Sequence, residues 1–317
     1  MKIAFIINGT SKYLSQVQER VHSACKDLDY TIYISERKGH IEELTQDAIS
    51  SNCNRIIVCG GDGSLNEAVN GLIQTFSIQS NEKGSHSYDW EGISKIKLGV
   101  FPIGSGNDFS KTVKVKNDIH QLKQLIVNDH SQMIDVGWAT YHDFSGQLAA
   151  RFFINITDVG MGGEVVAKLD NKITKSLGPS FNYLWAITST AATYQKVKIR
   201  ATANDFSWEG DIMNFVVANG KCFGKGLCIA PDASVSDGLF DIVILGDFSM
   251  LDFAKHIGKI KKGQKVNHPK IEYHRLKEVY IESLENKQLA IDMDGDYIGH
   301  VPLKLTNLEG KINFICK

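Results

Sequence analysis

The stretch GGDGSLNEAVNGL, Gly60 to Leu72, decides how the first part of this sequence folds. It follows directly on the apolar run RIIVC (55–59), and an amphipathic pattern begins inside it. Glycines between a buried strand and a helix let the backbone approach a ligand closely, and the free N–H groups of a helix N-terminus favour an anion. The stretch therefore predicts a phosphate-facing turn between a strand and a helix.

Asp62 is the residue of this turn that neither capping nor packing explains. Ser64 and Glu67 fit a capping box, with Ser64 as the N-cap, and Leu65 begins an apolar stripe. A carboxylate in a place that favours phosphate needs a hydroxyl or a cation between the two groups, and Mg²⁺ is the natural mediator. We therefore expect Asp62 to lie near bound magnesium.

Two further turns repeat this logic. FPIGSGNDFSK (101–111) again runs from an apolar strand through glycines to a helical pattern, and the first strand ends in the polar turn Asn8–Lys12. Ligands of open α/β sheets bind at the carboxyl ends of the strands. The sequence thus predicts one phosphate site from several turns, although a solvated helix-start lysine explains Lys12 equally well. No P-loop, dinucleotide-binding or protein-kinase motif occurs.

The order of apolar runs predicts two domains. In the first part, strands are expected at 2–8, 31–35, 55–60 and 97–104, alternating with helices at 13–28, 40–51, 64–76 and 119–128. This alternation is typical of a parallel sheet. From about Ile134 the chain reads as short strands separated by turns, interrupted by helical patterns only at 181–194 and 251–260, which predicts a β-rich second domain. The polar segment 77–95 is expected to be an exposed insertion.

Composition sets bounds on the class of protein. The formal net charge of -1 gives no global indication of nucleic-acid binding, and no stretch approaches the roughly 20 apolar residues of a membrane helix. The six cysteines show neither a C-x-x-C pair nor zinc-ligand spacing. We expect them to be reduced core thiols in a cytoplasmic protein.

At this point the motifs resemble a known family. GGDGSLNEAVNGL and FPIGSGNDFSK are similar to the diacylglycerol kinase catalytic domain, which bacterial lipid kinases share with sphingosine kinases. Three later segments resemble signatures of that family's second domain, in the same order: DVGMGGEVV (158–166), 214–245 and IDMDGDYIG (291–299). The resemblance covers nearly the whole chain. It departs from the family at Gly9, where proline is usual, at Lys12, where glycine is usual, and at Asp296, where glutamate is usual.

The resemblance implies an architecture. An N-terminal α/β nucleotide-binding domain with a parallel sheet (1–134, joined by the C-terminal segment 303–317) would precede a C-terminal β-sandwich domain (135–302). The active site would lie in the cleft between the two domains. ATP would be the phosphate donor, with Mg²⁺. The expected nucleotide-binding residues are Asn8, Gly9, Thr10, Ser11, Lys12, Ser35, Gly60, Gly61, Asp62, Gly63, Ser64, Leu65, Asn66, Gly104, Ser105, Asn107 and Asp108.

The resemblance also implies a proton acceptor and a second metal site. Asp296 matches the family's base position, with Asp294 and Asp62 as further catalytic candidates. A plain Asp-Gly hairpin turn at Asp294-Gly295 is the alternative, and the two glycine loops favour the catalytic interpretation over it. In bacterial relatives the segment around Asp237 holds a structural Mg²⁺, through the Asp237 carboxylate and backbone oxygens near Ser234 and Leu239. A turn without an ion fits that segment nearly as well.

The functional expectation is a lipid kinase. The acceptor would be diacylglycerol or a related lipid alcohol at a membrane surface, reached by peripheral contact without a membrane-spanning segment; a homodimer stays open. The basic stretch KHIGKIKKGQKVNHPK (255–270) suits anionic lipid, and a solvated loop explains it slightly better. The alternatives are an NAD kinase-like small-molecule kinase and an inactive lipid-binding regulatory module.

Overall fold

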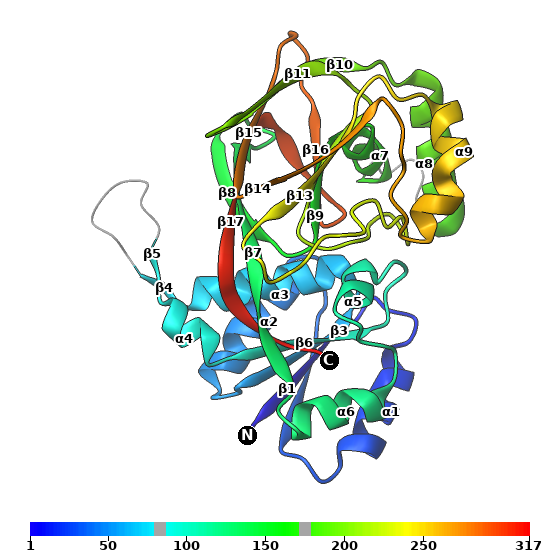
Figure 1. Cartoon of the computed structure of the whole chain (residues 1–317). Coiled ribbons are helices and arrows are strands. Elements are labelled where there is room, and N and C mark those ends of the chain that lie inside the picture. Colours follow the sequence, from blue (N-terminus) through cyan, green and yellow to red (C-terminus); the bar gives the residue numbers. More distant parts are fainter. Residues whose placement is uncertain (79–86, 171–178) are drawn as a thin grey trace. The chain divides into compact units, whose positions relative to one another are not determined.

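The computed structural model describes residues 1–78, 87–170 and 179–317, which divide into two compact units. Unit 1 comprises Met1–Val136, Val235–Asp237 and Leu308–Lys317. Unit 2 comprises Gly137–Ser234 and Gly238–Asn307. The chain thus passes between the units several times, and both long strands, β7 (Ser131–His142) and β17 (Asp296–Ile315), begin in one unit and end in the other (Figure 1).

A parallel sheet forms the centre of unit 1. Its strands run in the order β17–β6–β3–β1–β2, in which β17 contributes only its last part, through Asn313 and Phe314 against β6. All pairs in this series are parallel. The other elements of unit 1 are β1 (Ile3–Ile7), α1 (Leu14–Cys25), β2 (Tyr30–Ile34), α2 (His40–Ser50), β3 (Arg55–Gly60), α3 (Asp62–Thr75), β4 (Ser77–Ile78), β5 (Ser87–Tyr88), α4 (Trp90–Ser94), β6 (Lys97–Pro102), α5 (Asp108–Thr112) and α6 (Ile119–Val127).

Continuous apolar runs account for the central strands of unit 1. All residues of β1 are buried, and so are all but the first residues of β3 and β6, as expected for strands of a parallel sheet that is covered on both faces. Because every strand of the sheet points the same way, the turns after β1, β2, β3 and β6 meet at one edge. These are the turns in which the sequence places its small polar residues.

Unit 2 is an antiparallel β structure with a helical layer. One run of paired strands is β14–β13–β12–β9–β16–β17, and a second is β17–β15–β10–β11, with β7 and β8 also attached through β17. The elements are β8 (Leu148–Phe153), β9 (Ile156–Gly160), α7 (Met161–Asp170), α8 (Pro179–Thr193), β10 (Val197–Ala203), β11 (Phe206–Ile212), β12 (Asn214–Ala218), β13 (Phe240–Leu245), α9 (Met250–Lys261), β14 (Ile271–Leu276), β15 (Glu278–Ser283) and β16 (Ala290–Met293).

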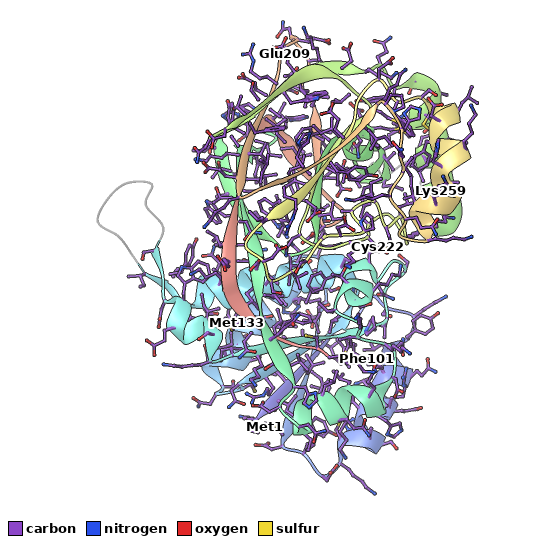
Figure 2. The ribbon with its side chains drawn as sticks, in the orientation of Figure 1. Met1, Phe101, Met133, Glu209, Cys222 and Lys259 are labelled. Carbon is purple, nitrogen blue, oxygen red and sulfur yellow. A yellow bond between two sulfur atoms is a disulfide. The ribbon has the colours of Figure 1, made fainter. Side chains whose placement is uncertain are left out.

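Alternate residues of the strands in unit 2 face two different cores. Phe215 and Val217 of β12 pack between the two runs of strands, together with residues of β10 and β15, whereas Val216 and Ala218 face a cluster to which α7, α8 and α9 contribute. The strand is therefore buried on both faces, which explains why NFVVA reads as an uninterrupted apolar run. Side chains fill the interior of each unit (Figure 2).

The expected fold class is confirmed, with three differences in detail. Helix α7 was not expected, because its first turn, Met161-Gly162-Gly163, looks like a loop in sequence. The capping-box interpretation of Ser64 is wrong: α3 begins at Asp62, so Ser64 lies inside the helix. In the expected insertion, residues 79–86 lie outside the described residues, and the flanking residues form β4, β5 and α4.

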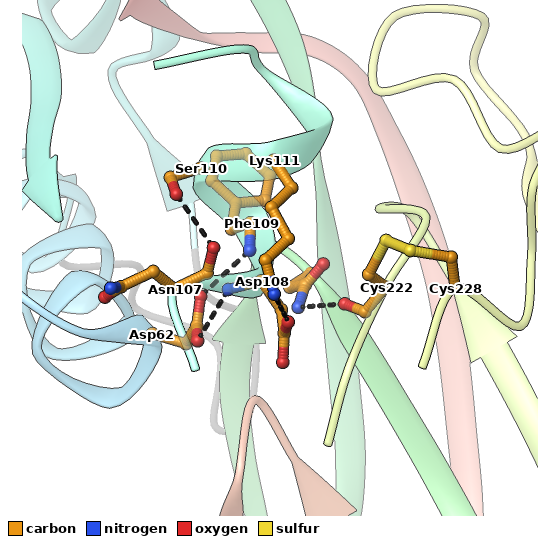
Figure 3. The surroundings of a disulfide bond; sticks show 9 residues. Asp62, Asn107, Asp108, Phe109, Ser110, Lys111, Cys222 and Cys228 are labelled. Carbon is orange, nitrogen blue, oxygen red and sulfur yellow. Dashed lines mark hydrogen bonds and ion pairs between the residues drawn. A yellow bond between two sulfur atoms is a disulfide. The ribbon is translucent and has the colours of Figure 1, made fainter. Parts of the chain in front are cut away.

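The expectation that all cysteines are free is also wrong. Cys222 and Cys228 form a disulfide that closes a short loop of unit 2 (Figure 3). Phe223 and Leu227 pair within that loop, which brings the two cysteines together. The remaining four cysteines (Cys25, Cys53, Cys59 and Cys316) are free and buried.

Candidate active site

Two glycine loops of unit 1 touch backbone to backbone. Gly60 and Gly61 follow β3, and Gly104 follows β6, the neighbouring strand. A Cβ added to Gly104 would lie 2.4 Å from the Cα of Gly61, so no larger residue fits at Gly104 without moving the loops apart. The Gly104 and Ile103 N–H groups both donate to the Gly60 carbonyl. These glycines therefore hold the two loops together at the edge of the sheet.

The Asp62 carboxylate fastens the second loop to the first. Its Oδ2 accepts the Asp108 N–H at 3.0 Å and its Oδ1 accepts the Phe109 N–H at 2.9 Å (Figure 3). Burial raises the pKa of Asp62, and these two amide hydrogen bonds offset part of that effect. Asp62 thus has a structural role that sequence reasoning did not foresee, because both oxygens bind the start of α5.

The loop after β6 is closed by its own side chains. The Asn107 side chain accepts the Gly104 N–H and donates to the Gly104 carbonyl, each at 2.8 Å, and Asn107 itself has a positive φ of 52°. The buried Asp108 carboxylate pairs with Lys111 Nζ at 2.6 Å. Ser105, between them, is exposed. The loop is therefore held from inside, and Ser105 is the hydroxyl that it presents outward.

The turns after β1 and β2 join the same edge. The Asn8 amide donates to Ser64 Oγ at 3.2 Å, and the Gly9 N–H donates to Ser35 Oγ at 3.2 Å. A Cβ at Gly9 would lie 2.1 Å from the Ser35 carbonyl oxygen, which explains a glycine where the family usually has proline. Hydrogen bonds thus connect the turn of Asn8 and Gly9 to Ser35 after β2 and to Ser64 in the first turn of α3.

The expected nucleotide-binding residues differ in what they can offer a ligand. Leu65 and Asn66 are buried, and Asn66 accepts from the Asn70 amide, so their side chains support α3. Thr10 and Lys12 are exposed, and Lys12 Nζ lies 5.0 Å from the centre of the Tyr13 ring. A Cβ at Gly63 would meet nothing within 4 Å. The open positions at this edge include Thr10, Lys12 and Gly63.

Asp294 and Asp296 have different environments in unit 2. Asp294 and Gly295 form a two-residue hairpin turn between β16 and β17, with positive φ at both residues. The buried Asp294 carboxylate accepts the N–H groups of Ile154, Asn155 and Ile156 at 3.0 Å each. Asp296 is partly exposed, and its Oδ2 lies 3.9 Å from Arg151 Nη2. Asp294 therefore holds the backbone of residues 154–156 in place, while Asp296 is the more accessible acid.

Sequence reasoning missed a second pair of acids in unit 2. Asp158 of β9 and Asp292 of β16 are opposite each other in an antiparallel pair, so their side chains share one face. Both are buried, and neither oxygen of Asp158 has a hydrogen-bond partner of good geometry within the described residues, although the Asn214 side chain and the Gly163 N–H lie near enough to lower its pKa. Burial raises the pKa of Asp158 to about 7 and that of Asp292 well above its usual value, which the neighbouring Asp158 charge raises further. The feature of the sequence that could have indicated this pair is the acid inside the otherwise apolar strand ITDVG.

The described residues provide little for a tightly bound metal ion. They contain no group of three or more His, Cys, Asp or Glu side chains that could hold one. Near the glycine loops, Asp62 is bound to two amides and Asp108 to Lys111, which suits an ion that arrives with phosphate oxygens rather than one held by protein alone. Of the expected structural site, Asp237 belongs to unit 1 and Ser234 and Leu239 to unit 2, and that site stays a prediction.

Comparison with known proteins accounts for both parts of the chain. The family model described as the diacylglycerol kinase catalytic domain matches residues 2–139. The model described as the YegS C-terminal NAD kinase beta sandwich-like domain matches residues 157–316. The chain belongs to the diacylglycerol kinase catalytic-domain family. The resemblance drawn from the glycine loops is thereby confirmed.

Relatives agree with this family, and solved structures share the fold. The chain is 26% identical to a diacylglycerol kinase of Staphylococcus carnosus over 88% of its own length and 82% of the relative, and 27% identical to one of Staphylococcus aureus over 89% and 80%. A crystal structure from Bacillus anthracis has a TM-score of 0.73 at 23% identity and covers 100% of this chain and 97% of that one. A yeast NADH kinase complexed with NADH has a TM-score of 0.50 at 8% identity, covers 100% of this chain and 84% of that one, and shows likeness of fold alone.

The family match and the relatives named diacylglycerol kinase place the chain among the kinases. Among the described residues, no helix is long and apolar enough to cross a bilayer.

Proposed function

We propose that the chain is an ATP-dependent lipid kinase that phosphorylates the hydroxyl of diacylglycerol or of a related lipid alcohol. The observation that carries the proposal is the contact between the two glycine loops, which the Asp62 carboxylate fastens at the ends of neighbouring parallel strands. Such an edge is where α/β sheets bind ligands. The curated relatives named diacylglycerol kinase support the lipid acceptor.

The nucleotide would bind at the edge where the turns after β1, β2, β3 and β6 meet. Helix α3 begins at Asp62, so the N–H groups of its first turn and its dipole favour phosphate there. Gly63 leaves space for the phosphates, and Thr10, Lys12 and Ser105 are exposed side chains that can bind them. The buried members of the set, including Asn66 and Asn107, keep these groups in place.

Asp296 would accept the proton of the acceptor hydroxyl. A bond forms between that oxygen and the γ-phosphorus, the bond from the γ-phosphorus to the β–γ bridging oxygen breaks, ADP leaves, and the proton passes to the Asp296 carboxylate. Asp294 is the poorer candidate, because its oxygens already accept three backbone amides that protonation would disturb. It is better placed to order residues 154–156.

Magnesium would enter with ATP. It supplies charge neutralisation for the transferring phosphoryl group. With Asp62 and Asp108 both engaged, the protein would contribute few ligands, as is usual for Mg²⁺ bound mainly through substrate phosphates and water. Asp237 is the carboxylate of the second, structural site expected with Ser234 and Leu239.

The decisive experiment is phosphoryl transfer from radiolabelled ATP across a panel of acceptors. The panel holds diacylglycerol, monoacylglycerol, a sphingoid base and NAD, each with and without Mg²⁺. We expect labelled product with a lipid alcohol and none with NAD. Product with NAD alone supports an NAD kinase, and the absence of any product from the folded chain supports an inactive lipid-binding module.

A further inference from the structure

The outer face of helix α9 carries a stripe of lysines. At ~100° per residue, Lys255 and Lys259 fall on one side of the helix axis, opposite Phe253 and Ile260, which face the core of unit 2. Lys262 is the C-cap residue that follows them at the end of the helix. All three lysines are exposed. Figure 2 shows Lys259 on α9 at the outer side of unit 2. The first part of the basic stretch, residues 255–261, is thus a helix with a defined charged face, and residues 262–270 follow it without regular structure.

In the part of the chain that the structure describes, acids offset only part of the charge of this stripe: Asp252 interacts electrostatically with Lys255. Within the described residues, Lys255, Lys259 and Lys262 form no ion pair, whereas nearby lysines do: Lys265 pairs with Asp232 and Lys270 with Asp247. The acid in the first turn of α9, Asp252, is bound by Ser249 in a capping box. The acids around α9 are therefore in use, and the stripe keeps a net positive charge.

The same face also carries an exposed apolar side chain, and a glycine with free space around it. Leu251 lies one turn before Lys255 and is 74% exposed, the largest exposed fraction but one among the large apolar residues described. Gly258, between the lysines, has nothing within 4 Å of where a Cβ would lie. An exposed leucine beside lysines that form no ion pair, on an amphipathic helix, is typical of helices that bind at a membrane interface. Binding of a polyanion such as RNA depends on the positive charges and would gain nothing from the leucine.

We propose that the outer face of α9, formed by Leu251, Lys255, Gly258, Lys259 and Lys262, docks the protein on an anionic lipid surface. Lysine side chains meet the anionic headgroups, and Leu251 enters the boundary between headgroups and acyl chains. The inference deepens the proposed function, on which it rests for its choice of a membrane over another anionic partner. It names the surface through which a lipid acceptor would be approached.

Co-sedimentation of the full chain with vesicles tests the surface directly. We expect binding to phosphatidylcholine vesicles that contain phosphatidylglycerol and little binding to phosphatidylcholine alone. The triple variant Lys255→Ser/Lys259→Ser/Lys262→Ser should bind the anionic vesicles about 100-fold more weakly. The matched control Lys198→Ser/Lys277→Ser/Lys304→Ser removes the same charge from exposed lysines elsewhere in unit 2 and should bind within about twofold of the unchanged protein.

Two further measurements separate the sources of failure. Leu251→Ser should weaken binding to vesicles and leave binding to heparin unchanged, whereas heparin binding without vesicle binding would overturn the proposal in favour of a soluble polyanion. Equal vesicle binding by the two triple variants would also overturn it. Kinase assays on short-chain diacylglycerol in neutral detergent micelles test the kinase separately from the surface. If the chain is active there but the Lys255/Lys259/Lys262 variant binds anionic vesicles as well as the unchanged protein, only the docking surface is rejected. If the chain is inactive there but the variant loses vesicle binding as expected, only the kinase is rejected.

Discussion

At the scale of single residues, the two acids of the Asp294-Gly295-Asp296 turn have different environments. Asp294 accepts three backbone amides and is buried, while Asp296 is partly exposed near Arg151. A sequence can show that two carboxylates lie close together in a turn. It does not show which of them accepts hydrogen bonds from the backbone of a segment about 140 residues earlier in the chain.

The buried, hydrogen-bonded Asp294 and the partly exposed Asp296 are expected to respond differently to mutation. Asp296→Asn should lower kcat by about 100-fold or more through lost general-base catalysis, with the KM for ATP nearly unchanged, and Asp296→Glu should keep substantial activity. Asp294→Asn should instead lower the free energy of unfolding by about 1–3 kcal/mol, because one carboxylate oxygen is replaced by an amide group that cannot accept. Steady-state kinetics and urea unfolding of the variants check this. Loss of kcat in folded Asp294→Asn alone would move the base to Asp294.

The buried Asp158–Asp292 pair predicts a pH dependence of stability. Both folded-state pKa values are raised, Asp158 to about 7, so the folded protein holds protons that the unfolded chain releases near pH 4. The stabilising contribution is complete below the unfolded pKa and is lost as pH rises towards 7. Asp158→Asn should therefore flatten the fall in unfolding free energy between pH 4 and 7 and stabilise the protein at pH 8.

The measurement is urea unfolding across that pH range. Asp294 and Asp296 also act on the pair through their charges, so the variant is compared with the unchanged protein measured under the same conditions. A curve for Asp158→Asn that runs parallel to that of the unchanged protein would contradict the raised pKa values. The Asn214 side chain and the Gly163 N–H, which lower the pKa of Asp158, remain in the variant.

At the scale of elements, Glu67 of α3 caps a helix other than its own. Its Oε1 accepts the Gly39 N–H at 2.9 Å and its Oε2 accepts the Ile41 N–H at 3.1 Å, where α2 begins. A Cβ at Gly71 would lie 2.4 Å from the Glu42 carbonyl oxygen, so α2 and α3 also pack closely along their length. The spacing from Ser64 to Glu67 fits a capping box, but the carboxylate serves a neighbouring helix.

This arrangement predicts the order of two variants. Glu67→Ala should lower the free energy of unfolding by about 1–3 kcal/mol, because two N–H groups at the start of α2, that of Ile41 buried and that of Gly39 partly buried, lose their acceptor. Ser64→Ala should cost less, since Ser64 does not cap α3 and only its 3.2 Å bond from Asn8 is lost. Chemical denaturation gives both values, and an equal cost of the two variants would favour a capping box after all.

How far the sequence could predict the elements depends on which contacts form them. The central strands of unit 1 and the helices between them are predicted to within a few residues, because apolar runs and amphipathic periods are local signals; RIIVCG, for example, forms β3 as expected. The short elements β4, β5 and α4 were not predicted, because their segment is polar in sequence. Helix α7 was missed because Gly162 and Gly163 weaken its local pattern. Gly163 is required by α7 packing on β16, where a Cβ would lie 2.0 Å from the Ala290 carbonyl oxygen, and such a distant contact leaves no local trace.

The same distinction applies to the candidate site. The residue types and the turns after β1, β3 and β6 were predictable, because strand ends of a parallel sheet meet at one edge. The hydrogen bonds from Asp108 and Phe109 to Asp62 were not, because they join residues 46 and 47 positions apart through backbone donors that any residue carries. The Asp158–Asp292 pair likewise depends on the register between β9 and β16.

At the scale of the whole molecule, the last strand of the chain supports the glycine loop that follows β6. Phe314 is fully buried in unit 1, where its strand pairs with β6, and its ring meets that of Phe109 edge-on with centroids 5.3 Å apart. Phe109 is the residue whose N–H binds Asp62. A residue from the C-terminus therefore packs beneath the loop that the N-terminal glycine motif holds.

Phe314→Ala should thus affect both stability and nucleotide binding. Loss of a fully buried phenylalanine costs about 3–5 kcal/mol, and the freed Phe109 ring should loosen the start of α5, so the KM for ATP should rise and the amides of 104–109 should exchange faster with solvent. Phe248→Ala is the matched control: it empties an equally buried site in the helical layer of unit 2 and should cost similar stability while leaving the KM for ATP and exchange at 104–109 unchanged. If both variants raise the KM alike, lost stability alone explains the effect, and the support of the nucleotide loop by the C-terminal strand is refuted.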